Sequence, residues 1–389
     1  MSKHIALILS QPPGYSETFF RSKIKGLQEA GYRVSLFVYR GDAEFTDCAV
    51  FPMPKVFTNP FRHFFATLGV VLGLLPYLKR VTRYMKLERD AGRELKQVLK
   101  YVYINAKVLK SDADWLHFGF ATLALQSEHV AKAIHAKMAV SLRGFDIDVY
   151  PMKHPNCYAR LWQNVDKVHA ISKHTLQQGH YYGLPKNSPF QIITPAVKLV
   201  NTERTYKNRQ KAVKIITVGR LHWMKGYNDI LEALAIVKQY NNNFHYQIIG
   251  RGPEEEAIKF AIHQLGLQEH VTLLGKQPHE AVIKHVEKAE LYIQYSHSEG
   301  FCNAVLEAQA MGKLCIVSDG GGLPENIVHG ETGWVVPKRQ PKRLAKTLET
   351  VITLDATIKN QFSERAKARV KQHFTLKQQQ AKFVGFYND

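Results

Sequence analysis

Short apolar runs alternate with helix-length segments along this chain, and that rhythm constrains the fold more than any other feature. From residue 5 the chain reads IALILS, then TFFRSKIKGLQEAG, then RVSLFVY. A strand, a helix and a second strand in this order predict a right-handed βαβ unit, which belongs to a parallel sheet covered by helices on both faces. Further strands are predicted at DWLHF, MAVSLRG, KVHAIS and FQIITPA.

The same rhythm restarts at AVKIITVGR and continues through FHYQIIG, HVTLLG, ELYIQYS and KLCIVSD. With 389 residues the chain is too long for one ordinary core. We therefore predict an α/β protein with two doubly wound parallel-sheet domains that face each other across a cleft. The predicted boundaries are residues 1–200 for the first domain, 201–211 for a polar linker, 212–373 for the second domain, and 374–389 for a final helix that packs on either domain.

The net charge of +20 predicts anionic partners, such as an anionic membrane surface or phosphorylated substrates. The basic residues are spread along the whole chain, without an arginine-rich tract or an aromatic and basic platform, so we expect no nucleic-acid partner. Four cysteines without metal-ligand or disulfide spacing fit a reducing cytoplasm. The first apolar run is too short for a signal peptide, so we expect no export.

One segment, residues 60–110, interrupts the alternation of strands and helices. Its apolar run FFATLGVVLGLLPYL has fifteen residues and contains Pro76, which is short for a membrane span. Basic side chains flank this run: Arg62, Lys79, Arg80, Arg83 and Lys86. Two interpretations stay open, which are an in-plane helix on the inner face of an anionic membrane and a pair of core helices in the first domain.

The stretch SEGFCNAVLEAQAMG places two glutamates, Glu299 and Glu307, between a predicted strand and a short helix that ends at Gly312. Asn303 is a suitable N-cap, so the helix would present unpaired amides at Ala304, Val305 and Leu306, and such an end attracts anions. The helix is otherwise apolar, which predicts a buried Glu307 that needs hydrogen-bond donors. In the alternative interpretation, Glu307 only complements the helix dipole and Glu299 is a loop charge.

The second domain opens with ITVGRLHWMKGYNDILEAL, in which a loop after the strand carries Arg220 and Lys225. Two cations at the carboxyl end of a parallel strand suit a diphosphate, because Arg grips it in a bidentate manner and Lys acts as a point charge. The alternative is a solvated surface loop. The same predicted cleft contains the helix that follows Asn303, so two anion-binding features converge there.

Taken together, VGRLHWMKG, IIGRGPEEEAI, VTLLGKQPHEAV and SEGFCNAVLEAQAMGKLCIVSDGGGLPENIVHGETGWVVP resemble the donor half of the family 4 retaining glycosyltransferases, which have the GT-B fold. The resemblance is ordered and continuous over residues 213–337. It is looser in the first half, where QPPGYSETFFRSKIKGLQEAGYRVSLF is similar to the family's opening strand, glycine loop and helix. The nearest relatives in character are the enzymes that assemble exopolysaccharide or lipopolysaccharide repeat units.

The resemblance implies roles for the second-domain residues. Glu307 would bind the ribose hydroxyls of a nucleotide, and Glu299 would face the transferred sugar near its reacting carbon. Arg220 and Lys225 would neutralise the leaving diphosphate. Backbone amides in the stretch Gly300, Phe301, Asn303, Ala304 and Val305 would contribute to donor binding, and the base would lie against the backbone near Lys276 and Gln277.

In the first domain the resemblance implies that Gly14 lets the backbone approach the phosphates without a Cβ in the way. His117 matches a cleft histidine of the family, although taken alone it would more often be a satisfied core histidine. Arg143 stands where many members have a histidine, and we interpret it as an acceptor-binding or phosphate-binding residue. The triplet at Asp146 resembles the metal-binding motif of another glycosyltransferase fold, and we expect no metal there.

The resemblance implies a retaining, metal-independent glycosyltransferase. It would move a hexose from a nucleotide diphosphate sugar to an acceptor hydroxyl, on a saccharide or a lipid-linked saccharide of cell-surface polysaccharide synthesis, without a cofactor. We expect it in the cytoplasm, peripheral on the inner face of the cell membrane. The alternatives are a nucleotide-sugar epimerase or phosphorylase on the same fold, and a non-catalytic protein that binds a membrane surface or a polymer.

Overall fold

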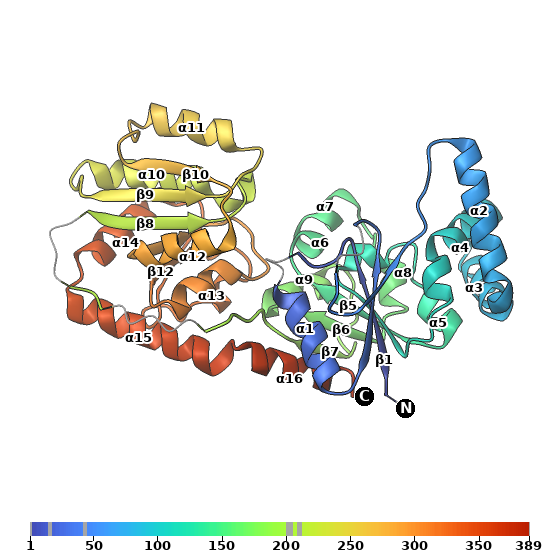
Figure 1. Ribbon diagram of the computed structural model, residues 1–389. Coiled ribbons are helices and arrows are strands. Elements are labelled where there is room, and N and C mark those ends of the chain that lie inside the picture. Colours follow the sequence, from blue (N-terminus) through green and yellow to red (C-terminus); the bar gives the residue numbers. More distant parts are fainter. Residues whose placement is uncertain (1, 15–17, 42–44, 200–204, 208–211, 389) are drawn as a thin grey trace. The chain divides into compact units, whose positions relative to one another are not determined.

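The computed structural model describes residues 2–14, 18–41, 45–199, 205–207 and 212–388, and the chain divides into two compact units (Figure 1). Unit 1 comprises Met1–Ile171, Thr175–Ile193 and Gln380–Asp389. Unit 2 comprises Ser172–His174 and Thr194–Gln379. The last ten residues of the chain therefore belong to the first unit.

Unit 1 is built on a seven-stranded parallel sheet with the order β3-β2-β1-β4-β5-β6-β7. Its strands are β1 (His4–Leu9), β2 (Arg33–Val38), β3 (Ala49–Pro52), β4 (Trp115–Phe118), β5 (Lys137–Leu142), β6 (Lys167–Ala170) and β7 (Phe190–Ile192). All were predicted from the alternation except β3, a four-residue edge strand that pairs with β2 and ends in a proline. Proline lacks an amide donor and is tolerated at such an edge.

The helices of unit 1 cover both faces of this sheet. Successive side chains of a strand point to opposite faces, so each strand contributes to a core on either side. Along β1, Ile5 and Leu7 join one core cluster, and Ala6 and Ile8 join the other. The helical segments are α1 (Thr18–Glu29), α2 (Pro60–Leu74), η1 (Leu75–Tyr77), α3 (Leu78–Asp90), α4 (Leu95–Leu109), η2 (Ala121–Ala124), α5 (Val130–Ile134), α6 (Phe145–Asp148), α7 (Tyr150–Lys153), α8 (Ala159–Trp162), α9 (Lys173–Tyr181) and α16 (Leu376–Phe386).

The end of the chain closes one of these two cores. The predicted final helix over 374–389 is α16, which starts after α15 has ended at His373. Phe383, Phe386 and Tyr387 are completely buried and pack with Ile5, Leu7 and Leu9 of β1. The carboxyl end of the chain therefore supplies part of the core of unit 1.

Unit 2 has a six-stranded parallel sheet with the order β10-β9-β8-β11-β12-β13. Its strands are β8 (Val213–Val218), β9 (Phe244–Ile249), β10 (Val271–Gly275), β11 (Leu291–Gln294), β12 (Leu314–Ser318) and β13 (Trp334–Val336). Its helical segments are η3 (Trp223–Lys225), α10 (Tyr227–Lys238), α11 (Glu255–Gln264), α12 (His279–Lys288), α13 (Asn303–Ala310), η4 (Leu323–Glu325), α14 (Pro341–Thr353) and α15 (Ala356–His373).

The strand order of unit 2 reverses between β8 and β11, because the chain leaves β8 toward β9 on one side and returns to pair β11 on the other. In open α/β sheets ligands bind outside the carboxyl ends of the strands at such a switch point. The loops that follow β8 and β11 carry the predicted Lys225 and Glu299. The predicted fold class, with two parallel-sheet α/β domains, is confirmed.

Of the predicted linker 201–211, residues 201–204 and 208–211 lie outside the described residues. Its middle, at residues 205–207, is attached to unit 2. Tyr206 is buried, and its hydroxyl donates to the carbonyls of Glu290 and Gly312. The polar composition of the predicted linker therefore gave no indication that Tyr206 attaches its middle to unit 2.

The segment 60–110 forms α2, α3 and α4, and the two interpretations of it apply to different parts. Helices α3 and α4 contribute buried side chains such as Tyr84 and Tyr101 to the core of unit 1. Helix α2 has one buried residue, Leu74. The interpretation as core helices is therefore correct for α3 and α4 and wrong for most of α2.

Candidate functional site

The loop after β8 places Lys225 against Glu299. Gly226 follows Lys225 with φ +65°, and a Cβ there would lie 2.2 Å from the carbonyl oxygen of Tyr295, so the tight turn requires glycine. The Lys225 Nζ donates to Glu299 Oε1, and both side chains are largely buried. Burial lowers the pKa of Lys225, but Glu299 opposes this and the pKa lies above its usual value. Lys225 is therefore charged at neutral pH.

Arg220 lies on the same loop and is exposed to solvent. It is close enough to Lys225 for its charge to oppose protonation of that lysine. Two cations and one carboxylate thus meet at the switch point of the sheet. The site carries a net positive charge that a diphosphate would neutralise.

The loop that carries Glu299 is held by residues that the sequence analysis did not single out. Ser296 Oγ donates to Glu299 Oε1 at 3.2 Å. His297 donates its backbone N–H to the Met224 carbonyl at 2.7 Å, and its Nε2 lies 2.7 Å from Asp229 Oδ2. These bonds tie the loop after β11 to the loop after β8, so they fix the position of Glu299 relative to Lys225.

A glycine run packs on the other side of the Glu299 loop. The Gly322 N–H donates to the Glu299 carbonyl at 2.6 Å. A Cβ at Gly320 would lie 2.1 Å from the Ser296 carbonyl oxygen, and one at Gly322 would lie 2.0 Å from that of Gly300. The sequence carries a signal for this contact, namely three consecutive glycines directly after a predicted strand. Such a run indicates that two backbones approach each other closely.

Helix α13 begins at Asn303, so the residue at the N-cap is Cys302 and the predicted cap at Asn303 is wrong. Cys302 is held by Asn326, whose Oδ1 accepts the Cys302 N–H at 3.1 Å and whose Nδ2 donates to the Cys302 carbonyl at 3.0 Å. Burial and the Glu299 charge raise the pKa of the Cys302 thiol to about 12. The thiol is therefore neutral at physiological pH.

The predicted set of unpaired amides at the head of α13 is also corrected. The Leu306 N–H donates to the Cys302 carbonyl at 3.4 Å, as the first bond of the helix. The amides of Ala304 and Val305 face the Cys302 sulfur, where they lower the thiol pKa. Sulfur is a weak acceptor, so these two amides remain available to a stronger one.

Glu307 is one position further into α13 than the predicted cap at Asn303 placed it, and it is half-buried. Burial raises the pKa of its carboxyl, and His279 at the start of α12 opposes this shift. Among the described residues no hydrogen bond or ion pair reaches this carboxylate. A half-buried carboxylate that no protein donor reaches is open to a ligand that supplies hydroxyl donors.

The remaining predicted donor-site residues surround this group with less direct contacts. Gln277 follows β10, and its Nε2 donates to the Leu274 carbonyl at 2.6 Å, so its amide donor is partly engaged. Gly300 and Phe301 are buried, and the Phe301 ring lies 5.8 Å from that of Phe374. Of the predicted residues in unit 2, Lys225 and Glu299 are in direct side-chain contact.

His117, the predicted catalytic residue of unit 1, is less exposed to solvent than the sequence predicted. His117 is 1% exposed, and both of its nitrogens are engaged. Its Nδ1 contacts Lys23 Nζ at 3.1 Å and the Tyr387 hydroxyl, and its Nε2 lies 2.8 Å from Ser141 Oγ. The expectation of a histidine that faces a cleft is therefore corrected to the alternative, a satisfied core histidine.

Arg143 is half-buried with its guanidinium over the rings of Phe19 and Phe20, at 4.3 Å and 4.7 Å from the centroids. Gly14 is exposed, and a Cβ there would meet no atom within 4 Å. The roles predicted for these two residues stay predictions. The Asp146 carboxylate accepts backbone N–H bonds from Arg143, Gly144 and Ala121, which gives it a structural role.

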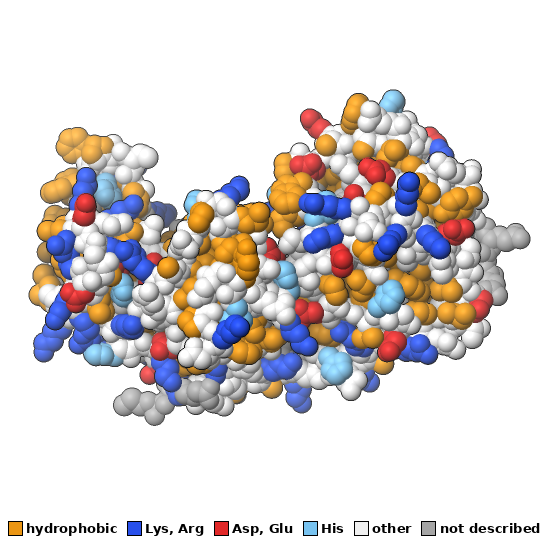
Figure 2. All heavy atoms as spheres, turned by 180° about the vertical axis from the view of Figure 1, so that it is seen from behind, with side chains coloured by type: hydrophobic (Ala, Val, Ile, Leu, Met, Phe, Trp, Pro, Cys, Tyr) orange, Lys and Arg blue, Asp and Glu red, His pale blue; other side chains and the backbone are white. Residues whose placement is uncertain are grey.

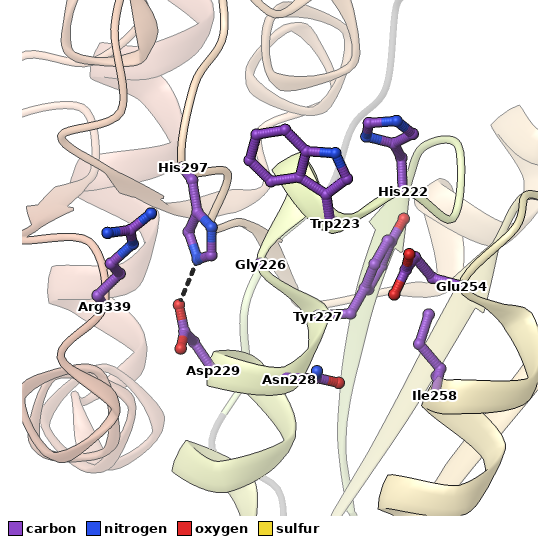
Figure 3. A pocket seen from close by; sticks show the side chains of 10 residues that line it. All are labelled: His222, Trp223, Gly226, Tyr227, Asn228, Asp229, Glu254, Ile258, His297 and Arg339. Atoms are coloured by element: carbon purple, nitrogen blue, oxygen red, sulfur yellow. Dashed lines mark hydrogen bonds and ion pairs between the residues drawn. The ribbon is translucent and has the colours of Figure 1, made fainter.

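A pocket of ≈ 280 Å³ opens beside the β8 loop, on the side of α10 and α11 (Figure 3). Its lining includes His222, Trp223, Asp229, Glu254, His297 and Arg339. Figure 3 shows the bond between His297 and Asp229, two of its lining residues. Neither predicted glutamate lines this pocket. It is therefore a neighbour of the Lys225 and Glu299 pair, distinct from the predicted donor site.

Comparison with known proteins matches residues 201–369 to the model of the family described as "Glycosyl transferases group 1". The match lies in the second half of the chain, whose residues are similar to this family. It is 28% identical to the amylovoran biosynthesis glycosyltransferase AmsK of Erwinia amylovora, over 64% of this chain and 63% of AmsK. It is 24% identical to the putative colanic acid biosynthesis glycosyltransferase WcaL of Escherichia coli, over 95% of this chain and 96% of WcaL.

Solved structures similar to this glycosyltransferase include a glycosyltransferase from Rickettsia africae, with a TM-score of 0.70 and 18% identity over 99% of this chain and 98% of the other. Anabaena HepE in complex with UDP gives a TM-score of 0.70 and 17% identity over 98% and 99%. At these identities the likeness shows the fold, which is GT-B. The predicted family and the prediction of an enzyme are confirmed.

Proposed function

We propose that this glycosyltransferase moves a hexose from a nucleotide diphosphate sugar to an acceptor hydroxyl, with retention at the reacting carbon and without a metal ion. The observation that carries the proposal is Glu307, a half-buried carboxylate without donors in unit 2. Glu307 lies on α13, and the first amides of this helix come shortly after Glu299 in the chain. Glu299 is the residue that pairs with Lys225. A nucleotide sugar would supply ribose hydroxyls to the carboxylate and a diphosphate to the cations.

In the reaction that we propose, the bond between the sugar carbon and the diphosphate oxygen breaks while the acceptor oxygen bonds to the same carbon on the same face. The acceptor's proton passes to an oxygen of the leaving diphosphate. Arg220, Lys225 and the amides of Ala304 and Val305 would stabilise the charge that develops there. Lys225 would share its charge between Glu299 and the diphosphate, since the free protein already pairs it with Glu299. These cations are the reason to propose turnover without a metal.

We further propose a saccharide acceptor of cell-surface polysaccharide synthesis, carried on a lipid at the cytoplasmic face of the membrane. The names of AmsK and WcaL, both biosynthesis glycosyltransferases of such polymers, support the polysaccharide. The complex of HepE with UDP supports a uridine nucleotide as the first donor to try.

A thermal-shift screen across nucleotides and nucleotide sugars tests the donor class. A ligand present at about 100 times its Kd raises the free energy of unfolding by about 2.7 kcal/mol, which is a clear shift in Tm. Hydrolysis of the stabilising donor, followed with and without EDTA, then tests turnover and metal dependence. Absence of any shift with nucleotide sugars contradicts the proposal, and loss of turnover in EDTA contradicts the metal-free mechanism.

A further inference from the structure

Helix α2 presents a continuous apolar surface to solvent. Eight large hydrophobic side chains on α2, η1 and the start of α3 are between 45% and 76% exposed: Phe61, Phe64, Phe65, Leu68, Val71, Leu72, Leu75 and Leu78. Figure 2 shows hydrophobic side chains along the outer edge of unit 1 at the end where α2 lies. Contiguous exposed apolar patches on a protein surface mark interaction sites.

The orientation of α2 is fixed by its other face. His63 packs its ring edge-on against Tyr103 of α4, with centroids 5.2 Å apart, and Leu74 is buried. A Cβ at Gly73 would lie 2.5 Å from Lys110 Nζ, so the helix comes close to the end of α4. In the segment that leads into α2, the Lys55 carbonyl accepts a hydrogen bond from the Tyr103 hydroxyl at 2.6 Å. Both ends are thus attached to unit 1, and the opposite face is left outward.

The charge around this surface has a single sign. No aspartate or glutamate occurs between Asp47 and Glu88, a stretch that contains six basic residues: Lys55, Arg62, Lys79, Arg80, Arg83 and Lys86. Between Arg62 and Lys79 the chain has no Lys, Arg, Asp or Glu. An apolar face with cations at both of its ends is the pattern of a helix that lies in the interface of an anionic bilayer.

Two of these cations serve the fold, which changes the charge set expected from the sequence. Arg80 donates to the carbonyls of Leu109 and Ser111, and Arg83 donates to that of Ala133. The other four are exposed: Lys55 precedes α2, and Arg62, Lys79 and Lys86 lie on α2 and α3. These three helical residues are the ones that flank the apolar face and are available to lipid headgroups.

The geometry favours a helix in the membrane plane over one that crosses the membrane. By length and composition the helical stretch Pro60–Asp90 is apolar enough to cross a bilayer, and 11% of its most apolar window is buried. Helix α2 itself has 15 residues, about 22 Å at 1.5 Å per residue, against a hydrocarbon core of about 30 Å. After the turn at Pro76, α3 returns into the core through Val81 and Tyr84.

A second copy of the chain is a poorer occupant for the same face. Two copies that pack α2 against α2 would bring Arg62, Lys79 and Lys86 of both chains around one apolar contact, without an acidic residue in the segment to offset them. Repulsion between like charges opposes that arrangement. Anionic headgroups offset the same charges.

We propose that α2 attaches this glycosyltransferase to an anionic membrane as an in-plane helix, with the side chains from Phe61 to Leu78 in the lipid interface. The proposal deepens the proposed function by naming its partner surface, and it rests on that function only for the lipid-linked acceptor. Attachment itself requires only the apolar face and the three exposed cations that flank it.

Co-sedimentation with vesicles of phosphatidylcholine and phosphatidylglycerol tests the proposal on the full chain. We expect binding that rises with the phosphatidylglycerol fraction and falls with salt. Replacement of Phe64, Phe65, Leu68 and Leu72 by Gln should lower the partition coefficient at least about 10-fold. Replacement of Arg62, Lys79 and Lys86 by Gln should lower it on the order of 100-fold, at about 1 kcal/mol for each charge.

Matched controls change exposed residues elsewhere: Met152→Gln with Phe260→Gln for the apolar set, and Lys342, Lys346 and Lys371 to Gln for the charges. Unchanged binding in the α2 variants overturns the proposal, as does an equal loss in the controls. A dimer in light scattering that the α2 variant converts to monomer, with no vesicle binding, assigns the face to a second copy and also overturns it. Hydrolysis of the donor is also measured on every variant without vesicles. Loss of hydrolysis counts against the proposed function. Retained hydrolysis shows that any change in vesicle binding is independent of that function.

Discussion

Each unit of this glycosyltransferase holds a cluster of ionisable side chains, and the two clusters differ in whether the chain itself completes them. In unit 1 the His169 Nε2–H donates to the Ile193 carbonyl, so Ser141 donates to His169 Nδ1 and accepts from His117 Nε2–H. The His117 Nδ1 then accepts from Tyr387 and Lys23. Every polar group in this chain of bonds has a partner.

In unit 2 the cluster is unfinished. Lys225 and Glu299 pair with each other, while Glu307 has no donor among the described residues and two amides at the head of α13 face only a sulfur. Polar groups that the chain satisfies maintain the fold, and half-buried groups that it leaves without partners are prepared for a ligand. The comparison therefore assigns structure to the cluster at His117 and substrate binding to the one at Glu307.

The largest effect is expected from the cation of the unfinished cluster. Lys225→Met should lower the single-turnover rate of donor cleavage about 10² to 10³-fold, because a positive charge at the leaving diphosphate is lost. Lys284→Met, at an exposed lysine of α12, should leave the rate unchanged. A Lys225 variant with the wild-type rate would break the assignment of this loop to the diphosphate.

A smaller effect, on stability, is expected in unit 1. His117→Phe removes the partner of Ser141, Lys23 and Tyr387 and should lower the free energy of unfolding by about 2 kcal/mol in urea titration. Donor affinity should stay as in the wild type. His263→Phe, at an exposed histidine of α11, is the control. Unchanged stability together with lost turnover would make His117 catalytic and remove the contrast between the clusters.

A third prediction concerns the pH dependence that a completed cluster imposes. Burial, and then the charge of Arg143, hold the pKa of Lys23 well below its usual 10.5. Between the folded pKa and 10.5 the unfolded chain binds the extra proton, so stability rises with pH, by up to about 1.4 kcal/mol per pH unit. Lys23→Met should remove this slope between pH 7 and 9.5, whereas Lys25→Met on the exposed side of α1 should keep it. An identical slope in Lys23→Met contradicts a buried neutral lysine.

The sequence was sufficient to predict the parallel sheets and the convergence of the loop that carries Lys225 with the segment that leads into the helix after Asn303. Strand and helix periodicity is local, and loops at the carboxyl ends of adjacent parallel strands must meet. Local patterns also explain the miss at β3, whose four residues are too few for an alternation to be visible.

The errors in the site come from contacts between distant residues. The Nδ1 of His117 is hydrogen-bonded to the hydroxyl of Tyr387, which lies 270 positions further along the chain, and no local pattern links the two residues. The start of α13 is set by Asn326, which holds Cys302 from 24 positions away, so the better capping residue by type, Asn303, is displaced by one. The run from Gly320 to Gly322 was visible in the sequence, but its partner loop was not.

The measurement that tests the central comparison most directly is donor affinity beside single-turnover rate for Glu307→Gln and Glu299→Gln. Glu307 would contact ribose hydroxyls that are present equally in ground and transition states, so its variant should bind donor about 10-fold more weakly and cleave bound donor at nearly the wild-type rate. Glu299→Gln should bind donor nearly as well and cleave it more slowly. A Glu307 variant with wild-type donor affinity would contradict the account.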